Sequence, residues 1–166
     1  AWANMHELAA THDDLAAILR RTNAVLNDSR TDKFVTLFFL RLNPVRRTFT
    51  YAAAGHRAYL LRSDGTREIL DCTGPPLGVM DNSDIQNSGE YSLASGDALF
   101  IPTDGIEETH QNKTEMFGKE RMLKEATARA QDSAESMIHA VFNAAREFAA
   151  GTPQQDDMTA VAVRVR

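Results

Sequence analysis

Two acidic segments that lie far apart in the sequence stand next to apolar runs and could bind a metal ion. Asp104 follows the apolar run Ala98–Ile101, and Asp156 and Asp157 directly precede the apolar-rich segment Met158–Val165. Each run is typical of a strand, and a strand end holds a carboxylate on a rigid element while leaving it open to solvent. A hard cation takes several carboxylate oxygens from separate segments. If the two segments meet, they predict a divalent-metal site.

Each acidic segment taken alone has an ordinary explanation. Asp-Gly is a common turn dipeptide, and adjacent acids before a strand are often simply solvated. Together they carry more weight, because like charges brought close together repel unless a metal ion or a proton neutralises them. Two such segments supply too few ligands for a complete binuclear centre.

One histidine falls where it could matter to such a site. His56 follows one strand-like segment and precedes another. It is either a loop histidine that hydrogen-bonds to the backbone or a residue at the edge of the site, and the sequence leaves both roles open. The other histidines lack metal-ligand spacing and are interpreted as surface or packing residues: His6, His12, His110 and His139.

Composition limits the class of protein. The 166 residues are 43% apolar and 25% charged, which suits one globular domain spanning residues 1–166. The net charge of −5 without a basic tract argues against nucleic-acid binding. The longest apolar run, Phe34–Leu40, is too short to cross a membrane. The single cysteine, Cys72, cannot form an internal disulfide, so a reducing, cytoplasmic location is expected.

Hydrophobic periodicity predicts an α+β fold in which antiparallel sheets are flanked by amphipathic helices. Hairpin-like spacing and turn residues, such as Gly65, favour antiparallel pairing. The expected helices cover Leu15–Leu26, Gly118–Ala130 and Ser133–Ala150. The expected strands are Phe34–Leu40, Thr48–Ala54, Ala58–Arg62, Glu68–Leu70, Tyr91–Leu93, Ala98–Ile101 and Met158–Val165.

Four finer expectations can be checked against the structure. The run Phe34–Leu40 is apolar at consecutive positions, which predicts a strand covered on both faces. Residues 81–88 are polar and are expected to be exposed. Asp132 with Glu135 resembles a capping box for the last helix. A helix is expected to end over residues 2–10, with Thr11 capping the next one.

Taken together, the motifs resemble the SpoIIE/RsbU-type serine phosphatases, the bacterial branch of the metal-dependent 2C-type protein phosphatases. The resemblance covers nearly the whole chain, and the motifs follow the family's order. They are Phe34-Val-Thr-Leu-Phe, Tyr51-Ala-Ala-Ala-Gly-His, Gly74-Pro-Pro-Leu-Gly-Val, Ser95-Gly-Asp, Thr103-Asp-Gly-Ile-Glu-Glu, Phe117-Gly and Pro153-Gln-Gln-Asp-Asp-Met-Thr.

The resemblance implies a sandwich of two antiparallel sheets with helices outside and a pair of Mn²⁺ or Mg²⁺ ions at one end. It implies that Asp104 and Asp156 are catalytic metal ligands, with Asp157 as a neighbouring ligand. His56 matches the Gly-His motif and is assigned to substrate binding at the site edge. Glu108 matches an acid that is common after Thr-Asp-Gly. The implied reaction is attack of a metal-activated water on the phosphorus of a phosphorylated side chain.

One departure from the family pattern concerns an upstream Asp-x-x-Gly-His-Gly element, which supplies a bridging metal aspartate and is not found in this chain. We therefore interpret the chain as an N-terminally truncated excerpt that binds metal weakly and turns over little. An open sheet edge would also favour homodimers.

Two functions follow from these observations. The first is a phosphoserine or phosphothreonine phosphatase that acts on a bacterial regulator such as an anti-anti-sigma factor, with an upstream sensory or receiver domain in the parent chain. The second is a degenerate, non-catalytic phosphatase-like module that binds a partner protein. Retention of both Asp104 and Asp156 favours the enzyme, since a pure binding module need not keep both acids.

Overall fold

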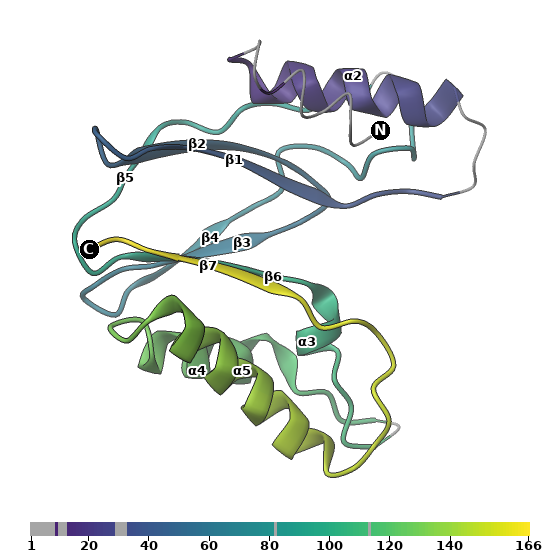
Figure 1. Ribbon diagram of the computed structural model, residues 1–166. Coiled ribbons are helices and arrows are strands. Elements are labelled where there is room, and N and C mark those ends of the chain that lie inside the picture. Colours follow the sequence, from purple (N-terminus) through teal and green to yellow (C-terminus); the bar gives the residue numbers. More distant parts are fainter. Residues whose placement is uncertain (1–8, 10–12, 29–32, 82, 113) are drawn as a thin grey trace. The chain divides into compact units, whose positions relative to one another are not determined.

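The computed structural model describes residues 9, 13–28, 33–81, 83–112 and 114–166 (Figure 1). The expected helix end over residues 2–10 falls outside this range except for Ala9, as does the Thr11 cap. The chain splits into two compact units. The first contains the described residues up to Arg57 together with Asp71–Leu93, and the second contains Ala58–Leu70 and Ala94–Arg166. Within the described ranges, no helix is long and apolar enough to cross a membrane.

The first unit combines one helix with a three-stranded antiparallel sheet. Helix α2 (Leu15–Asp28) accompanies strands β1 (Leu37–Asn43), β2 (Thr48–Ala54) and β5 (Tyr91–Ser92), in the order β1-β2-β5. The predicted pairing of the first two strands is confirmed. The apolar side chains of the first turns of α2 form a buried cluster with small alanines of β2, which allow close approach of the helix. The cluster comprises Leu15, Ala16, Ile18, Leu19, Ala52, Ala54, Leu77 and Ile85.

Two expectations for this unit are wrong. Phe34 and Val35 lie before β1 and are 63% and 39% exposed, and β1 itself is half-buried rather than covered on both faces. The reason is that β1 is an edge strand, paired with β2 alone among the described strands. Residues 81–88 are not uniformly exposed, because Ile85 packs into the α2 cluster and Ser83 is buried with its hydroxyl donating to the Met80 carbonyl.

The second unit contains a four-stranded antiparallel sheet covered by helices on one face (Figure 1). The strand order is β4 (Arg67–Leu70), β3 (Ala58–Leu61), β6 (Ala98–Pro102) and β7 (Ala160–Arg164). The predicted β3–β4 hairpin is confirmed, and Gly65 adopts a φ of 90° in its turn. The helices are α3 (Asp104–Glu107), α4 (Gly118–Ala128) and α5 (Ala134–Ala149). The α+β class with antiparallel sheets and flanking helices is therefore confirmed.

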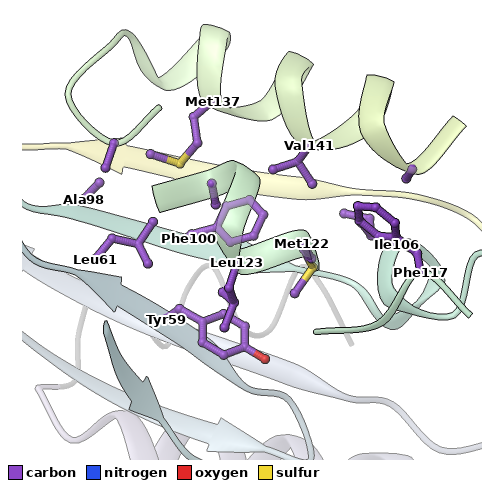
Figure 2. Packing of buried hydrophobic residues seen from close by; sticks show 13 residues of the cluster. Tyr59, Leu61, Ala98, Phe100, Ile106, Phe117, Met122, Leu123, Met137 and Val141 are labelled. Carbon is purple, nitrogen blue, oxygen red and sulfur yellow. The ribbon is translucent and has the colours of Figure 1, made fainter. Parts of the chain in front are cut away.

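The core of the second unit lies between this sheet and helices α4 and α5. Figure 2 shows Leu61 and Phe100 of the strands facing Leu123 of α4 and Met137 and Val141 of α5. All five side chains are at most 4% exposed. Burying a side chain of this size contributes about 1.5–3 kcal/mol. This packing fixes β6, the strand that leads to Asp104.

The cap of helix α5 differs from the expected one. Ser133 is the N-cap, and its hydroxyl accepts a hydrogen bond from the Ser136 N–H at 3.0 Å. Asp132 instead forms a surface ion pair with Arg129. A serine hydroxyl next to the first turn competes with the aspartate one residue earlier, and both are good N-cap residues. The helix ends as expected near Gly151, with Ala150 in the left-handed region at φ 48°.

A buried carboxylate fixes the turn that precedes β6. Asp97 is 1% exposed and accepts hydrogen bonds at 2.9 Å from Arg62 Nη1, the Ser63 N–H and the Ala94 N–H. Burial acts to raise the pKa of Asp97, but the hydrogen bonds from Ala94, Ser63 and Arg62 outweigh it and hold the pKa below its usual value. Asp97 thereby joins the start of β6 to the end of β3.

We expect Asp97→Asn to lower the free energy of unfolding by about 3 kcal/mol, because it leaves the Arg62 guanidinium without its buried partner. The stabilisation by Asp97 is complete above the ordinary pKa of 3.8 and is lost as the pH falls through the lower folded-state value. Urea unfolding at neutral and acidic pH measures both effects. The exposed Asp28→Asn serves as the control, with a change within about 0.5 kcal/mol. Equal stability of the two variants at neutral pH would contradict the assignment.

Candidate metal centre

The two acidic segments meet at one edge of the second sheet. β6 and β7 pair antiparallel with Pro102 opposite Ala160, so the end of β6 lies beside the start of β7. Asp104 follows β6 by two residues, and Asp156 and Asp157 come shortly before β7. The sheet register therefore brings together the segments whose meeting the sequence predicts.

Thr103 joins the two segments through both its backbone and its side chain. Its N–H donates to the Thr159 carbonyl at 2.8 Å, and its Oγ1 accepts from the Thr159 N–H at 2.9 Å. The same hydroxyl lies 3.1 Å from the Asp157 carbonyl and 3.2 Å from the Thr159 carbonyl, and it donates to this pair. The pairing of β6 and β7 thus continues beyond their last regular residues, up to the acidic positions.

Gly105 allows the segments to approach closely. A Cβ atom at this position would stand 2.5 Å from the carbonyl oxygen of Asp157 and 3.0 Å from its carbonyl carbon. The φ of Gly105 is not in the left-handed region, so the glycine is needed for space and not for backbone freedom. The expected turn at Asp104 and Gly105 is instead the first turn of the short helix α3, which begins at Asp104.

The carboxylates at this edge have the donor chemistry that a hard cation prefers. Asp104, Asp156 and Asp157 are all exposed, and none forms an ion pair with a described residue. Oδ1 of Asp104 accepts from the Gly105 N–H at 3.1 Å, and Oδ1 of Asp156 accepts from the Asp157 N–H at 2.7 Å. Oxygen donors of this kind fit Mg²⁺ or Mn²⁺. Across the described ranges, no group of three or more His, Cys, Asp or Glu side chains is arranged to hold a metal ion.

His56 and Glu108 are the remaining positions that the sequence singles out. His56 belongs to the first unit, half-buried in the segment between β2 and β3, and its assignment to substrate binding stays a prediction. Glu108 is the C-cap of α3; its side chain is exposed and its N–H donates to the Asp104 carbonyl at 2.9 Å.

Sequence reasoning missed the roles of Thr103 and Gly105. Both residues belong to the motif that carries Asp104, but the pattern shows only a threonine and a turn-like glycine. A pair of threonines, Thr103 before one acidic segment and Thr159 after the other, was the available signal. Its meaning depends on the β6–β7 register, which the sequence does not specify.

A comparison with protein families decides the relationship. The model of the family described as "Stage II sporulation protein E (SpoIIE)" matches residues 2–166. The chain belongs to the SpoIIE family. The match covers nearly the whole chain, including both acidic segments at the β6–β7 edge.

Individual relatives of this SpoIIE-family chain include phosphatases. Phosphoserine phosphatase RsbU of Bacillus subtilis is 25% identical over 165 residues, which cover 96% of this chain and 48% of RsbU. Protein IcfG of a Synechocystis species is 29% identical over 148 residues, covering 87% of this chain and 23% of IcfG. The chain therefore spans less than half the length of either curated relative.

Solved structures show the same fold. The SiaA-PP2C domain of Pseudomonas aeruginosa matches with a TM-score of 0.85 at 22% identity, covering 99% of this chain and 67% of that one. Identity at this level supports the fold and not a shared activity. The α+β architecture is therefore that of the 2C-type phosphatase domains.

We expect Gly105→Ala to separate the two acidic segments, because its methyl group would collide with the Asp157 carbonyl. The expected result is a loss of about 1–3 kcal/mol in the free energy of unfolding together with weaker Mn²⁺ binding. Urea unfolding and Mn²⁺ titration followed by electron paramagnetic resonance measure these changes. Gly89→Ala is the matched control, since no atom lies within 4 Å of a Cβ there and its φ is not in the left-handed region. The explanation fails if both variants behave alike.

Proposed function

We propose that the chain is a metal-dependent protein phosphatase domain that hydrolyses phosphoserine or phosphothreonine on a phosphorylated bacterial regulator, such as an anti-anti-sigma factor. The observation that carries the proposal is the close approach of the Asp104 and Asp156 segments at one sheet edge, where each segment bears exposed carboxylates without ion-pair partners in the described chain. Membership of the SpoIIE family and similarity to a phosphoserine phosphatase support it.

The proposed roles follow from the placement of the residues. Asp104 and Asp156 would hold Mn²⁺ or Mg²⁺, with Asp157 as the neighbouring ligand. Such an ion, when bound, stabilises negative charge on phosphate oxygens and makes a water molecule more acidic. Thr103 and Gly105 keep the two carboxylate segments in register and close together. His56 is proposed to contact the substrate.

The proposal extends to the setting of the chain. An upstream sensory or receiver domain, a cytoplasmic location and a homodimer all remain part of it. The name of the relative RsbU, a phosphoserine phosphatase, supports the proposed substrate class.

We expect Mn²⁺-dependent release of phosphate from an aryl phosphate, and we expect Asp104→Asn to lower it on the order of 100-fold or more. The reason is that the substitution removes the charge of a proposed metal ligand, and even residues behind such ligands contribute 10–100-fold. The protein is assayed as the 166-residue chain and as the longest form that its gene encodes. Asp81→Asn, at an exposed position in the first unit, is the control.

The two candidate functions give different results in this assay. Activity that needs Mn²⁺ and Asp104 supports the phosphatase, including the case in which only the longer form is active. If neither form releases phosphate at any metal concentration, the enzymatic proposal is wrong, and the non-catalytic protein-binding module takes its place.

A further inference from the structure

A pocket of about 160 Å³ adjoins the proposed metal centre within the second unit. Its walls come from the end of α3, the C-terminal end of α5 and the loop that carries Asp156. Asp156 and Gly105 both line it, so the pocket shares a wall with the acidic junction. Its apolar surface includes Ala149, Pro153 and Met158. Anything bound here would lie next to a phosphate held at that junction.

Three of the polar side chains around the pocket have partners within the protein. The Thr109 hydroxyl donates to the Gly105 carbonyl at 3.0 Å, and the Thr152 hydroxyl donates to the Gln111 carbonyl at 2.7 Å. The Gln154 amide donates to the Asp156 carbonyl at 2.7 Å. Nδ1 of His110 has no partner within the described ranges, but it is buried and does not open to solvent. The interior of the pocket therefore offers few groups to a polar ligand.

Charged groups of both signs line the pocket. Glu108 and Asp156 are acidic and Arg146 is basic, and none of the three forms an ion pair with a described residue. Asp156 belongs to the proposed metal centre, and the remaining pair, Glu108 and Arg146, gives no field of one sign that would attract an anion or a cation. Selection must then come from shape and from burial of apolar surface.

We propose that this pocket receives one apolar side chain, of the size of leucine or phenylalanine, from the phosphoprotein substrate near its phosphorylated residue. A cavity of about 150 Å³ with apolar walls holds a benzene molecule, which is the size of such a side chain. The inference rests on the proposed function, because it places the phosphorylated residue at Asp104 and Asp156. It adds a determinant of substrate choice that acts through the residues beside the phosphorylated one.

The test uses a heptapeptide in which one residue is phosphoserine and all six others are glycine. It is compared with a series of peptides in which one of these glycines at a time is replaced by leucine. The chain is labelled with [methyl-¹³C]methionine, and peptides are titrated in chelator so that no hydrolysis occurs. Met158 lines the pocket and reports occupancy, while exposed Met80 in the first unit is the reference. At least one leucine peptide should shift the Met158 signal saturably, with an affinity about tenfold or more above the all-glycine peptide.

Ala149→Leu places extra atoms in the pocket and should remove this preference, and Asn143→Leu on an exposed part of α5 should retain it. Equal affinities across the peptides, or a Met158 signal that does not respond, would overturn the proposal. The peptide series on the unchanged protein decides the matter even where Ala149→Leu does not fold. An active phosphatase without peptide preference contradicts the pocket alone, whereas a selective Met158 response in an inactive protein contradicts the proposed function alone.

Discussion

The close approach of the Asp157 carbonyl to Gly105 is the constraint on which the proposed centre depends. A Cβ atom at residue 105 would stand only 2.5 Å from this oxygen, so glycine is the one residue that fits at this position. The approach brings together, at one sheet edge, acidic residues that lie about fifty positions apart in the sequence. No described lysine or arginine forms an ion pair with these carboxylates, so their oxygens stay available to the proposed ion.

Hydrogen bonds at both ends of the β6–β7 pair hold the two strands in one register, and this register keeps the Asp157 carbonyl next to Gly105. At the end near Asp104, Thr103 bonds to Thr159 and Asp157. At the other end, the Val165 N–H donates to the Asp97 carbonyl at 2.9 Å, while the Asp97 carboxylate holds Arg62. A shift of β7 by one residue would break these contacts at both ends and turn its core side chains to the other face. The register of the pair therefore determines the site.

The sequence predicted the parts of the fold that periodicity controls. The hairpin at Gly65, the strand before Asp104 and the last two helices appear where their patterns place them. The errors occur where tertiary context decides. Phe34 is apolar yet exposed because it precedes β1 and lies outside the buried cluster of the first unit, and Ile85 is buried within a polar stretch because it packs into that cluster with α2. The proposed metal roles of Asp104 and Asp156 came from motif and resemblance. The space needed at Gly105 could not be predicted in this way, since it depends on the position of another segment.

The loop that carries Asp156 belongs to both the proposed metal centre and the pocket, which links chemistry to substrate choice. Its conformation is held by Thr152, bonded to the Gln111 carbonyl, and by Gln154, bonded to the backbone of Asp156 itself. A side chain seated against Ala149 and Met158 would restrict the same loop from its inner side. Binding energy from a residue beside the phosphoserine could then help to fix the position of a metal ligand, and this is a physical route by which a phosphatase with a small, exposed site can prefer one protein over another.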